Sequence, residues 1–241
     1  MTRLSVVVPA FREEAVIAAT VKDLRAGLEP VVEGGGLEVI VVDDGSDDRT
    51  ATRATEAGAD RVIRLFPHRG KGAAVRAGME AAEGAVVAFC DADLSYGPAQ
   101  VGRLLEKVEA GWDVAVGSRR HVDTVTLVRA RRIREVTGRA FSALTAFSVL
   151  ERRHDTQCGV KAFSADATGR IFGMARIEGF AFDVEVFVIA GRAGLSLVEV
   201  PVELSNSGAS SVRVGRDTVR MLRDVARVWW WARRGAYDRD R

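Results

Sequence analysis

The sequence predicts an α/β fold with a mostly parallel central sheet and helices on both of its faces. In the first half of the chain, short apolar runs alternate with helix-like stretches. The runs are rich in β-branched residues and lack polar alternation, which is typical of parallel strands covered on both faces. Polar loops of suggestive chemistry follow four of these runs, and ligands of such sheets bind at the carboxyl ends of the strands.

Each element of the first half follows from this alternation. The strand-like runs lie at residues 4–9, 37–44, 61–66, 85–90 and 113–118, and the helix-like stretches lie near residues 13–29, 48–58, 70–83 and 98–111. A helix between two parallel strands forms a βαβ unit. Repetition of that unit predicts a doubly wound, Rossmann-like sheet.

The pattern changes after residue 120. It predicts a helix over residues 129–150, a polar loop over 152–163, a helix near 180–193, a strand over 196–204 and a basic amphipathic helix over about 215–234. We find no internal repeat and no linker that would separate two independent domains. The 241 residues are enough for one large domain with a substantial core.

The composition is that of an ordinary globular protein, with 47% apolar residues. The two cysteines, Cys90 and Cys158, form no disulfide framework or zinc pattern, so we expect a reduced, cytoplasmic setting. Charged and apolar residues mix within the first dozen positions, which does not suit a signal peptide. No apolar run approaches the roughly 18–20 residues that are needed to span a bilayer.

The net charge of +2 hides two basic zones. Residues 119–139 contain seven Arg against two acidic residues, and residues 212–241 contain nine Arg against four Asp. Such zones suggest anionic partners or, alternatively, solvated helix faces. Aromatic residues make up only 7% of the chain and do not interleave with the arginines in a recognised binding motif, so we expect no nucleic-acid partner.

Two carboxylates, Asp91 and Asp93, directly follow the buried run of residues 86–90. Alternate residues of an extended segment point to the same side, so the two side chains can converge. Converging carboxylates suit Mg²⁺ or Mn²⁺, which prefer oxygen ligands and commonly share phosphate oxygens with a substrate. The alternative is a pair of solvated carboxylates in a turn at the end of a strand.

Two further loops suit a nucleotide. Asp43 and Asp44 follow the second strand, where carboxylates can accept hydrogen bonds from a base or a ribose. Gly70 and Gly72 flank Lys71 at a helix start, where free N–H groups and a lysine would suit a phosphate. The segment has neither the Walker spacing nor the GxGxxG spacing, and an ordinary helix entry is an equal alternative.

Together these motifs resemble the family 2 glycosyltransferases with a GT-A fold. The motifs are "VVVPAFREE", "VVDDGS", "RGKGAAVRAGM", "DAD", "GSRR", "DTQCGVKAF" and "GFAFDVE", and they run in order over residues 4–230. They most resemble the branch that makes polyprenyl-phosphate sugars, which includes dolichyl-phosphate β-glucosyltransferase and dolichyl-phosphate mannose synthase. The resemblance implies a catalytic domain over residues 1–214, with a nucleotide-sugar half (1–118) and an acceptor half (119–214), followed by a helix and tail over 215–241.

The resemblance also implies site residues. The nucleotide sugar would be held by Pro9, Ala10, Glu13, Asp43, Asp44, Lys71, Asp91, Ala92, Asp93, Ser211 and Arg213. The acceptor would meet Arg119, Arg131, Gln157 and Lys161. Asp183 and Glu185 would face the sugar and complete a catalytic set with Asp91, Asp93 and Arg119, while Asp91 and Asp93 would bind the Mg²⁺ or Mn²⁺. Arg12, His68 and Ser95 depart from the family pattern.

The implied reaction moves a hexose, from UDP-glucose or GDP-mannose, onto a polyprenyl or dolichyl phosphate with inversion. A phosphate acceptor is already an anion at neutral pH, since its second pKa is about 6, so it needs no general base. A soluble acceptor that reacts through a hydroxyl would need one, and that acceptor class is the alternative. A nucleotide-binding regulator without catalysis is the alternative from another class, whereas a dinucleotide oxidoreductase is disfavoured because "PAFREE" has no glycine.

The last helix predicts contact with a membrane surface. Its Arg residues share one face (Arg216, Arg220, Arg223 and Arg227), and apolar residues share the other (Val219, Leu222, Ala226 and Trp229). A basic face, an apolar face and clustered tryptophans are typical of an interfacial helix. We therefore expect peripheral attachment to the inner face of the membrane, here and through the 129–150 helix. Packing of both apolar faces on the sheet is the alternative.

Overall fold

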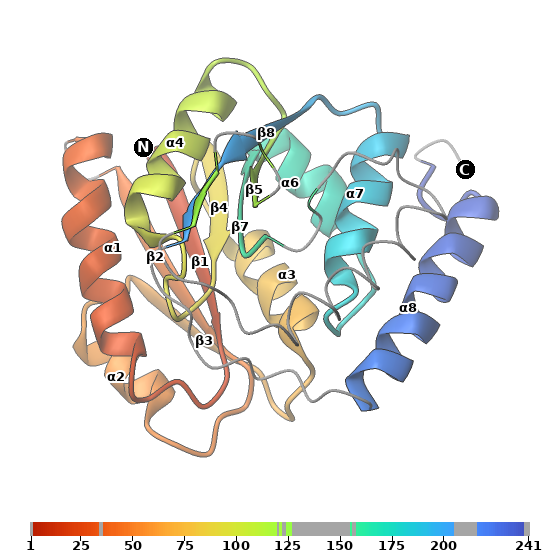
Figure 1. The fold of residues 1–241 in the computed structure, drawn as a ribbon. Helices are drawn as coiled ribbons and strands as arrows, with labels where there is room; N and C mark the ends of the chain where they lie inside the picture. Colours follow the sequence, from red (N-terminus) through yellow and green to blue (C-terminus); the bar gives the residue numbers. More distant parts are fainter. Residues whose placement is uncertain are drawn as a thin grey trace.

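The computed structural model describes residues 2–33, 36–119, 121, 124–126, 155, 158–204 and 216–238. Within them, seven strands form one sheet in the order β3-β2-β1-β4-β7-β5-β8 (Figure 1). A separate two-stranded pair joins β6 to β9. The strands are β1 (Leu4–Ala10), β2 (Leu37–Asp43), β3 (Arg61–Arg64), β4 (Val86–Cys90), β5 (Val114–Ser118), β6 (Val125–Thr126), β7 (Val160–Ser164), β8 (Leu197–Pro201) and β9 (Glu203–Leu204).

The predicted α/β class and parallel strands are confirmed. β1 pairs in parallel with β2 and with β4, and β2 pairs in parallel with β3. Every residue of β1, β2 and β4 is buried, which explains why these runs are apolar without alternation. Because these strands run the same way, their carboxyl ends and the loops that follow them share one edge of the sheet.

Strand β7 was not predicted, since we assigned residues 152–163 to a polar loop. It lies antiparallel between β4 and β5 in the middle of the sheet. Its second residue, Lys161, is fully buried and interrupts the apolar pattern that marks the other central strands. Helix α6 (Ala165–Phe172) was also missed; it begins after Ser164, whose hydroxyl accepts a hydrogen bond from the Ala167 N–H.

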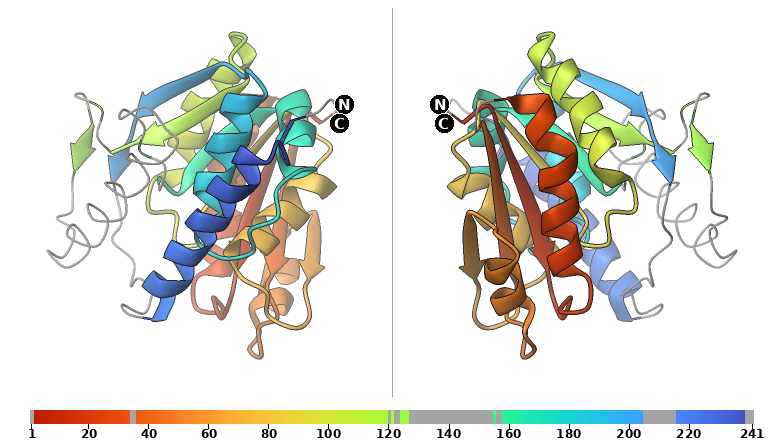
Figure 2. Two further views of the ribbon diagram at one scale, coloured as in Figure 1. Left: turned by 90° about the vertical axis from the view of Figure 1, so that its right-hand side faces the viewer. Right: turned by 90° about the vertical axis from the view of Figure 1, so that its left-hand side faces the viewer.

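Helices cover both faces of the sheet, as expected. They are α1 (Ile17–Val32), α2 (Thr50–Glu56), α3 (Lys71–Ala81), α4 (Gly97–Glu109), α6, α7 (Phe182–Arg192) and α8 (Arg216–Arg233). Apolar side chains of α1, α2 and α4 pack on one face, and those of α3, α6 and α7 pack on the other (Figure 2). Helix α8 lies outside α7 on this second side and belongs to the same core cluster.

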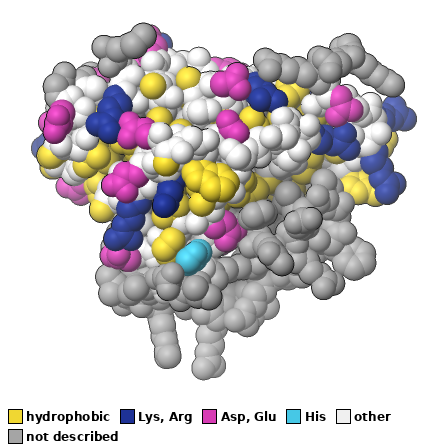
Figure 3. Space-filling view, turned by 90° about the horizontal axis from the view of Figure 1, so that it is seen from above, with side chains coloured by type: hydrophobic (Ala, Val, Ile, Leu, Met, Phe, Trp, Pro, Cys, Tyr) yellow, Lys and Arg dark blue, Asp and Glu magenta, His cyan; other side chains and the backbone are white. Residues whose placement is uncertain are grey.

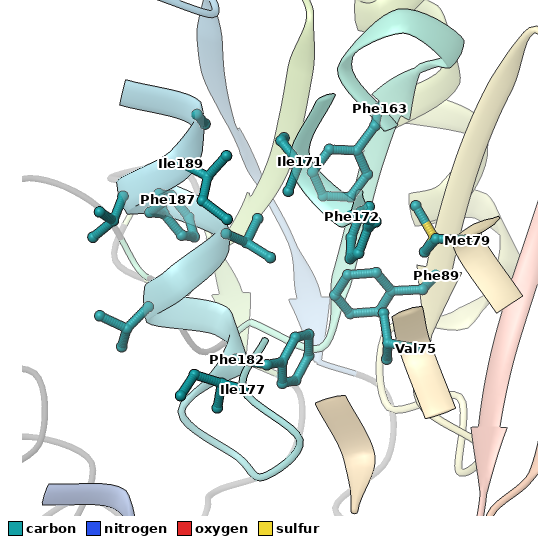
Figure 4. Packing of buried hydrophobic residues seen from close by; sticks show 14 of the residues in the cluster. Val75, Met79, Phe89, Phe163, Ile171, Phe172, Ile177, Phe182, Phe187 and Ile189 are labelled. Atoms are coloured by element: carbon teal, nitrogen blue, oxygen red, sulfur yellow. The ribbon is translucent and has the colours of Figure 1, made fainter. Parts of the chain in front are cut away.

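Aromatic side chains fill the core between α7 and the sheet. Phe89 of β4 lies 6.3 Å from Phe163 and 5.8 Å from Phe182, measured between ring centroids (Figure 4). Phe163 in turn meets the edge of Phe172 at 5.4 Å. Such ring pairs stabilise beyond the area that they bury, so this cluster fixes α6 and α7 against the strands that carry the polar loops.

Helix α8 buries a different face from the one that its sequence suggested. Val225, Val228 and Ala232 are buried against the rest of the protein. The predicted apolar face instead points outward: Val219 is 69% exposed and Leu222 is 37% exposed. Packing on the sheet therefore does not explain that face. The predicted helix over residues 129–150 lies outside the described residues, and none of the helices that the structure describes is long and apolar enough to cross a membrane.

Candidate active site at the carboxyl edge of the sheet

Two carboxylates at the end of β2 hold the loop that precedes α3. Asp43 is fully buried and accepts hydrogen bonds from the Ser46 N–H at 3.0 Å and from Arg64 Nε at 3.2 Å. Asp44 accepts from the backbone N–H of Arg69 at 2.9 Å and of Gly70 at 2.7 Å. Both carboxylates therefore fix loop geometry at the edge where a nucleoside was expected.

The end of β1 lies beside Asp44 at the same edge of the sheet. The Asp44 N–H donates to the Ala10 carbonyl at the end of β1, so Pro9 and Ala10 border the same loop. Nearby, His68 stacks on Phe11 with ring centroids 4.1 Å apart, and its Nδ1 lies 2.8 Å from an Asp44 oxygen. At the start of α3, Phe11 and His68 thus present an aromatic surface beside the predicted nucleoside residues.

The glycines that flank Lys71 have a packing role that the sequence did not reveal. Gly70 has a φ of +125°, and a Cβ there would lie 2.5 Å from the Glu178 carbonyl oxygen. A Cβ on Gly72 would lie 2.4 Å from the Ile177 carbonyl oxygen. The loop before α7 thus sits directly against the start of α3, and only glycine permits this approach. The result is a fixed backbone position for Lys71.

Asp91 is held between a lysine and a glycine. Lys71 Nζ lies 2.5 Å from Asp91 Oδ1. On the other side, a Cβ added to Gly159 would come within 2.0 Å of Asp91 Oδ2. Gly159 directly precedes β7, so this strand brings the "CGVKAF" segment onto the carboxylate pair. This contact cannot be predicted from the sequence, because the two segments are far apart in the chain.

Negative charge accumulates around this pair. Burial raises the pKa of Glu13, and the nearby carboxylates of Asp93, Asp48 and Asp91 raise it further. Burial by itself lowers the pKa of Lys71, but Asp91 and Asp183 outweigh that effect and the pKa of Lys71 is raised overall. The site therefore favours cations.

A divalent cation fits Asp91 and Asp93. Ser95 donates to Asp93 Oδ1 through its N–H at 3.1 Å and its hydroxyl at 2.8 Å, which orients the carboxylate. In the part of the chain that the structure describes, no group of three or more His, Cys, Asp or Glu side chains could hold a metal ion. Mg²⁺ is commonly held by one or two carboxylates together with substrate phosphates and water, so two carboxylates suffice. The backbone of Ala92 between them is held by the Thr20 hydroxyl, which donates to the Ala92 carbonyl at 2.5 Å.

Lys161 was predicted on the acceptor side, and the structure places its ammonium group in the interior of the protein. It is fully buried, and its Nζ donates to Asp183 Oδ1 at 2.7 Å and to the Cys158 carbonyl at 2.8 Å. The ammonium also lies 5.2 Å from the centre of the Phe89 ring, a favourable cation–π position. The role that the structure gives Lys161 is to hold Asp183.

Asp183 and Glu185 are placed differently. Asp183 is 9% exposed; burial raises its pKa, while Lys161 and Lys71 partly oppose the rise. Glu185 is fully buried and accepts hydrogen bonds from the N–H groups of Arg176 and Ile177 and from the Tyr237 hydroxyl. Glu185, which was predicted to face the sugar with Asp183, is placed by the structure where it ties the loop before α7 to the segment after α8.

Arg119 is positioned by a residue that the sequence analysis missed. Asp155 is 1% exposed. Its carboxylate accepts hydrogen bonds from Arg119 Nε at 2.7 Å, from Arg119 Nη2 at 2.8 Å and from the Arg119 backbone N–H at 3.0 Å. Such a bidentate pair fixes the plane of the guanidinium. The other predicted residues Arg131, Gln157, Ser211 and Arg213 lie outside the described residues.

The chain is similar to known proteins over most of its length. Residues 5–172 match the family model described as "Glycosyl transferase family 2". The chain is 32% identical over 94% of its length to the dolichyl-phosphate β-glucosyltransferase of Drosophila melanogaster, of which it covers 74%, and 34% identical over 94% to that of Homo sapiens, of which it covers 77%. It is 34% identical to the glycosyltransferase AglD of Haloferax volcanii, but it spans only 37% of that protein.

Solved structures show the same fold. Glucosyl-3-phosphoglycerate synthase from Mycobacterium tuberculosis, in complex with Mn²⁺, UDP and glucosyl-3-phosphoglycerate, aligns with a TM-score of 0.68 at 22% identity. The alignment covers 95% of this chain and 80% of that one. A complex of the same enzyme with Mn²⁺ and UDP-glucose gives a TM-score of 0.69. At this identity the likeness concerns the fold alone.

Proposed function

This chain belongs to glycosyl transferase family 2, and on that basis we propose that it transfers a hexose from a nucleotide sugar to a polyprenyl phosphate with inversion. The observation that carries the proposal is the contact of Lys71 with Asp91, which together with Asp93 follows β4 at the carboxyl edge of the sheet. The relatives of the chain include dolichyl-phosphate β-glucosyltransferases. UDP-glucose is the first donor to test and GDP-mannose the second. We place the nucleoside against Pro9, Ala10 and the Asp43–Asp44 loop.

The main role that we propose for the site is to stabilise the negative charge that develops on the leaving group. Asp91 and Asp93 would hold Mg²⁺ or Mn²⁺, which would offset the charge on the departing nucleoside diphosphate. Glu13 and Ala92 border this position, and Lys71 adds a fixed positive charge beside it. Ser211 and Arg213 are proposed to contact the diphosphate, as the family resemblance implies.

The acceptor side depends on Arg119. The Arg119 side chain is 44% exposed, although Asp155 fixes the plane of its guanidinium group. The guanidinium group can therefore still bind an acceptor phosphate. Arg131 and Gln157 are proposed to complete this surface. A phosphate dianion attacks without a general base, so the protein contributes mainly alignment. Asp183, held by Lys161, is the carboxylate that we propose to face the sugar.

Turnover with purified lipid acceptor tests the proposal. UDP-glucose and GDP-mannose would be incubated with undecaprenyl or dolichyl phosphate in detergent, with Mg²⁺, with Mn²⁺ and with EDTA. We expect one donor to react, only when the lipid phosphate is present, and EDTA to abolish the reaction. Donor turnover with a soluble hydroxyl compound and without lipid would instead support a soluble-acceptor enzyme, and no turnover with either acceptor class would contradict the proposal.

We further propose that α8 attaches the enzyme peripherally to the cytoplasmic face of the membrane. Trp230 is 48% exposed and lies further along the same helix than the outward-facing Val219 and Leu222. The guanidinium of Arg233 lies 3.5 Å from the Trp229 ring centre, and that of Arg234 lies 4.0 Å from the Trp230 ring centre. Figure 3 shows dark blue basic side chains beside yellow hydrophobic ones at its right-hand edge, the end of the molecule where α8 lies in Figure 1.

Removing the apolar side chains of this face should weaken membrane binding. We expect the double variant Leu222→Ser/Trp230→Ser to bind vesicles rich in anionic lipid about tenfold more weakly than wild type, because it loses buried apolar area. Co-sedimentation with such vesicles measures the difference. Trp112→Ser is the matched control, since Trp112 is 39% exposed at the end of α4 and should not contribute. Equal binding of both variants would contradict the assignment of this face.

A further inference from the structure

The geometry around Asp91 points to competition: we infer that Lys71 and the divalent cation compete for the same carboxylate oxygen, so that metal binding releases Lys71 toward the donor diphosphate. The inference rests on the proposed function only in assuming that a divalent cation binds Asp91. Lys71 would then have two successive partners, first Asp91 and then the donor diphosphate, and not a phosphate contact alone.

The approach to Asp91 is one-sided. Oδ2 faces Gly159, where even a methyl group would lie 2.0 Å away, so there is little space for a ligand on that side. Oδ1 is the oxygen that Lys71 Nζ contacts at 2.5 Å. A cation that binds Asp91 must therefore use the oxygen that already carries an ammonium group, and the two positive charges repel at that distance.

Within Lys71, the side chain can move and the backbone cannot. Its backbone is the first residue of α3 and lies between Gly70 and Gly72, both packed against the 177–179 loop. The side chain is 24% exposed, so it has room to rotate. The backbone at the start of α3 is therefore fixed. A cation that displaces Lys71 from Asp91 must move Nζ and leave this backbone in place.

Negative charge beyond Asp91 also acts on Lys71. After Asp91, Asp183 is the charged group that most strongly raises the pKa of Lys71. Lys161 already binds one Asp183 oxygen. Asp183 therefore attracts the Lys71 ammonium group but cannot fully neutralise its charge. The phosphates that a metal ion shares with Asp91 and Asp93 would supply the remaining negative charge. Metal and donor binding should therefore be cooperative through Lys71.

Mn²⁺ titration without donor tests the inference. We expect Lys71→Met to bind Mn²⁺ about tenfold more tightly than wild type, because removal of one nearby positive charge favours the cation. With Mn²⁺ saturating, the same variant should bind UDP about tenfold more weakly. Arg69→Met is the matched control: it removes the same charge two residues away, from an exposed arginine paired with Glu178, and should change Mn²⁺ affinity by less than about twofold.

A measurement on the wild-type chain is independent of variant folding. Amine labelling followed by peptide mass spectrometry should show that Mg²⁺ alone accelerates modification of Lys71, while exposed Lys22 and Lys107 do not change. Lys71→Met that binds Mn²⁺ no more tightly than Arg69→Met would overturn the inference, as would unchanged labelling of Lys71. Either result leaves the transferase assay above unaffected, so the two proposals can fail separately.

Discussion

Replacing Gly159 with alanine is expected to lower metal-dependent glycosyl transfer by about a hundredfold while the protein remains folded, in keeping with the cost of misplacing a reacting group by an ångström. The new Cβ would lie 2.0 Å from Asp91 Oδ2 and 2.7 Å from Asp91 Cγ, so one of the two must move. Gly159 precedes a central strand that is bonded on both sides, whereas Asp91 is a side chain at a strand end. The carboxylate should therefore yield, and with it the metal position.

Gly169→Ala is the control for this variant. Gly169 lies in α6, and a Cβ there meets nothing within 4 Å, so the same chemical change should leave activity intact. Thermal unfolding of both variants would establish that each is folded, and kcat and Mn²⁺ affinity would then be compared. Wild-type Mn²⁺ affinity in folded Gly159→Ala would show that Asp91 does not depend on this glycine.

The sequence predicts best those elements whose residue pattern alone defines them. The β-branched runs predicted β1, β2 and β4 to within a residue or two, and the rule that loops meet at the carboxyl edge placed Asp44 and Asp91 correctly at one end of the sheet. A parallel sheet demands continuous burial, and continuous burial is visible in the sequence.

The failures have a common cause, which is pairing between distant segments. The sequence predicts a loop at β7 because Lys161 is polar. Its burial there depends on the contacts of its ammonium group, above all with Asp183, 22 residues later. The contacts of Asp155 and Glu185 could not be predicted for the same reason: their partners lie 36 residues before and 52 residues after them. No periodicity encodes such contacts.

Lys161→Met should destabilise the protein by about 3–5 kcal/mol in the free energy of unfolding, because it leaves Asp183 as a buried charge without its partner. Lys161 is fully buried, and its ammonium donates to Asp183 at 2.7 Å, so water cannot readily replace it. Denaturant unfolding at neutral pH would measure the loss. Adding Asp183→Asn to the variant removes the unpaired charge at nearly constant shape, and we expect the double variant to recover much of the stability.

The pH dependence distinguishes this explanation from simple loss of packing. Burial raises the pKa of Asp183 in the native protein, and Lys161 opposes that rise, so the pKa should be higher still in Lys161→Met. Protonation neutralises the unpaired carboxylate. The stability difference from wild type should then be full above the pKa of Asp183 in the variant and should shrink as the pH falls through it. A difference that is constant with pH, and equal in the double variant, would mean that methionine merely packs badly and that Lys161 does not hold Asp183 by charge.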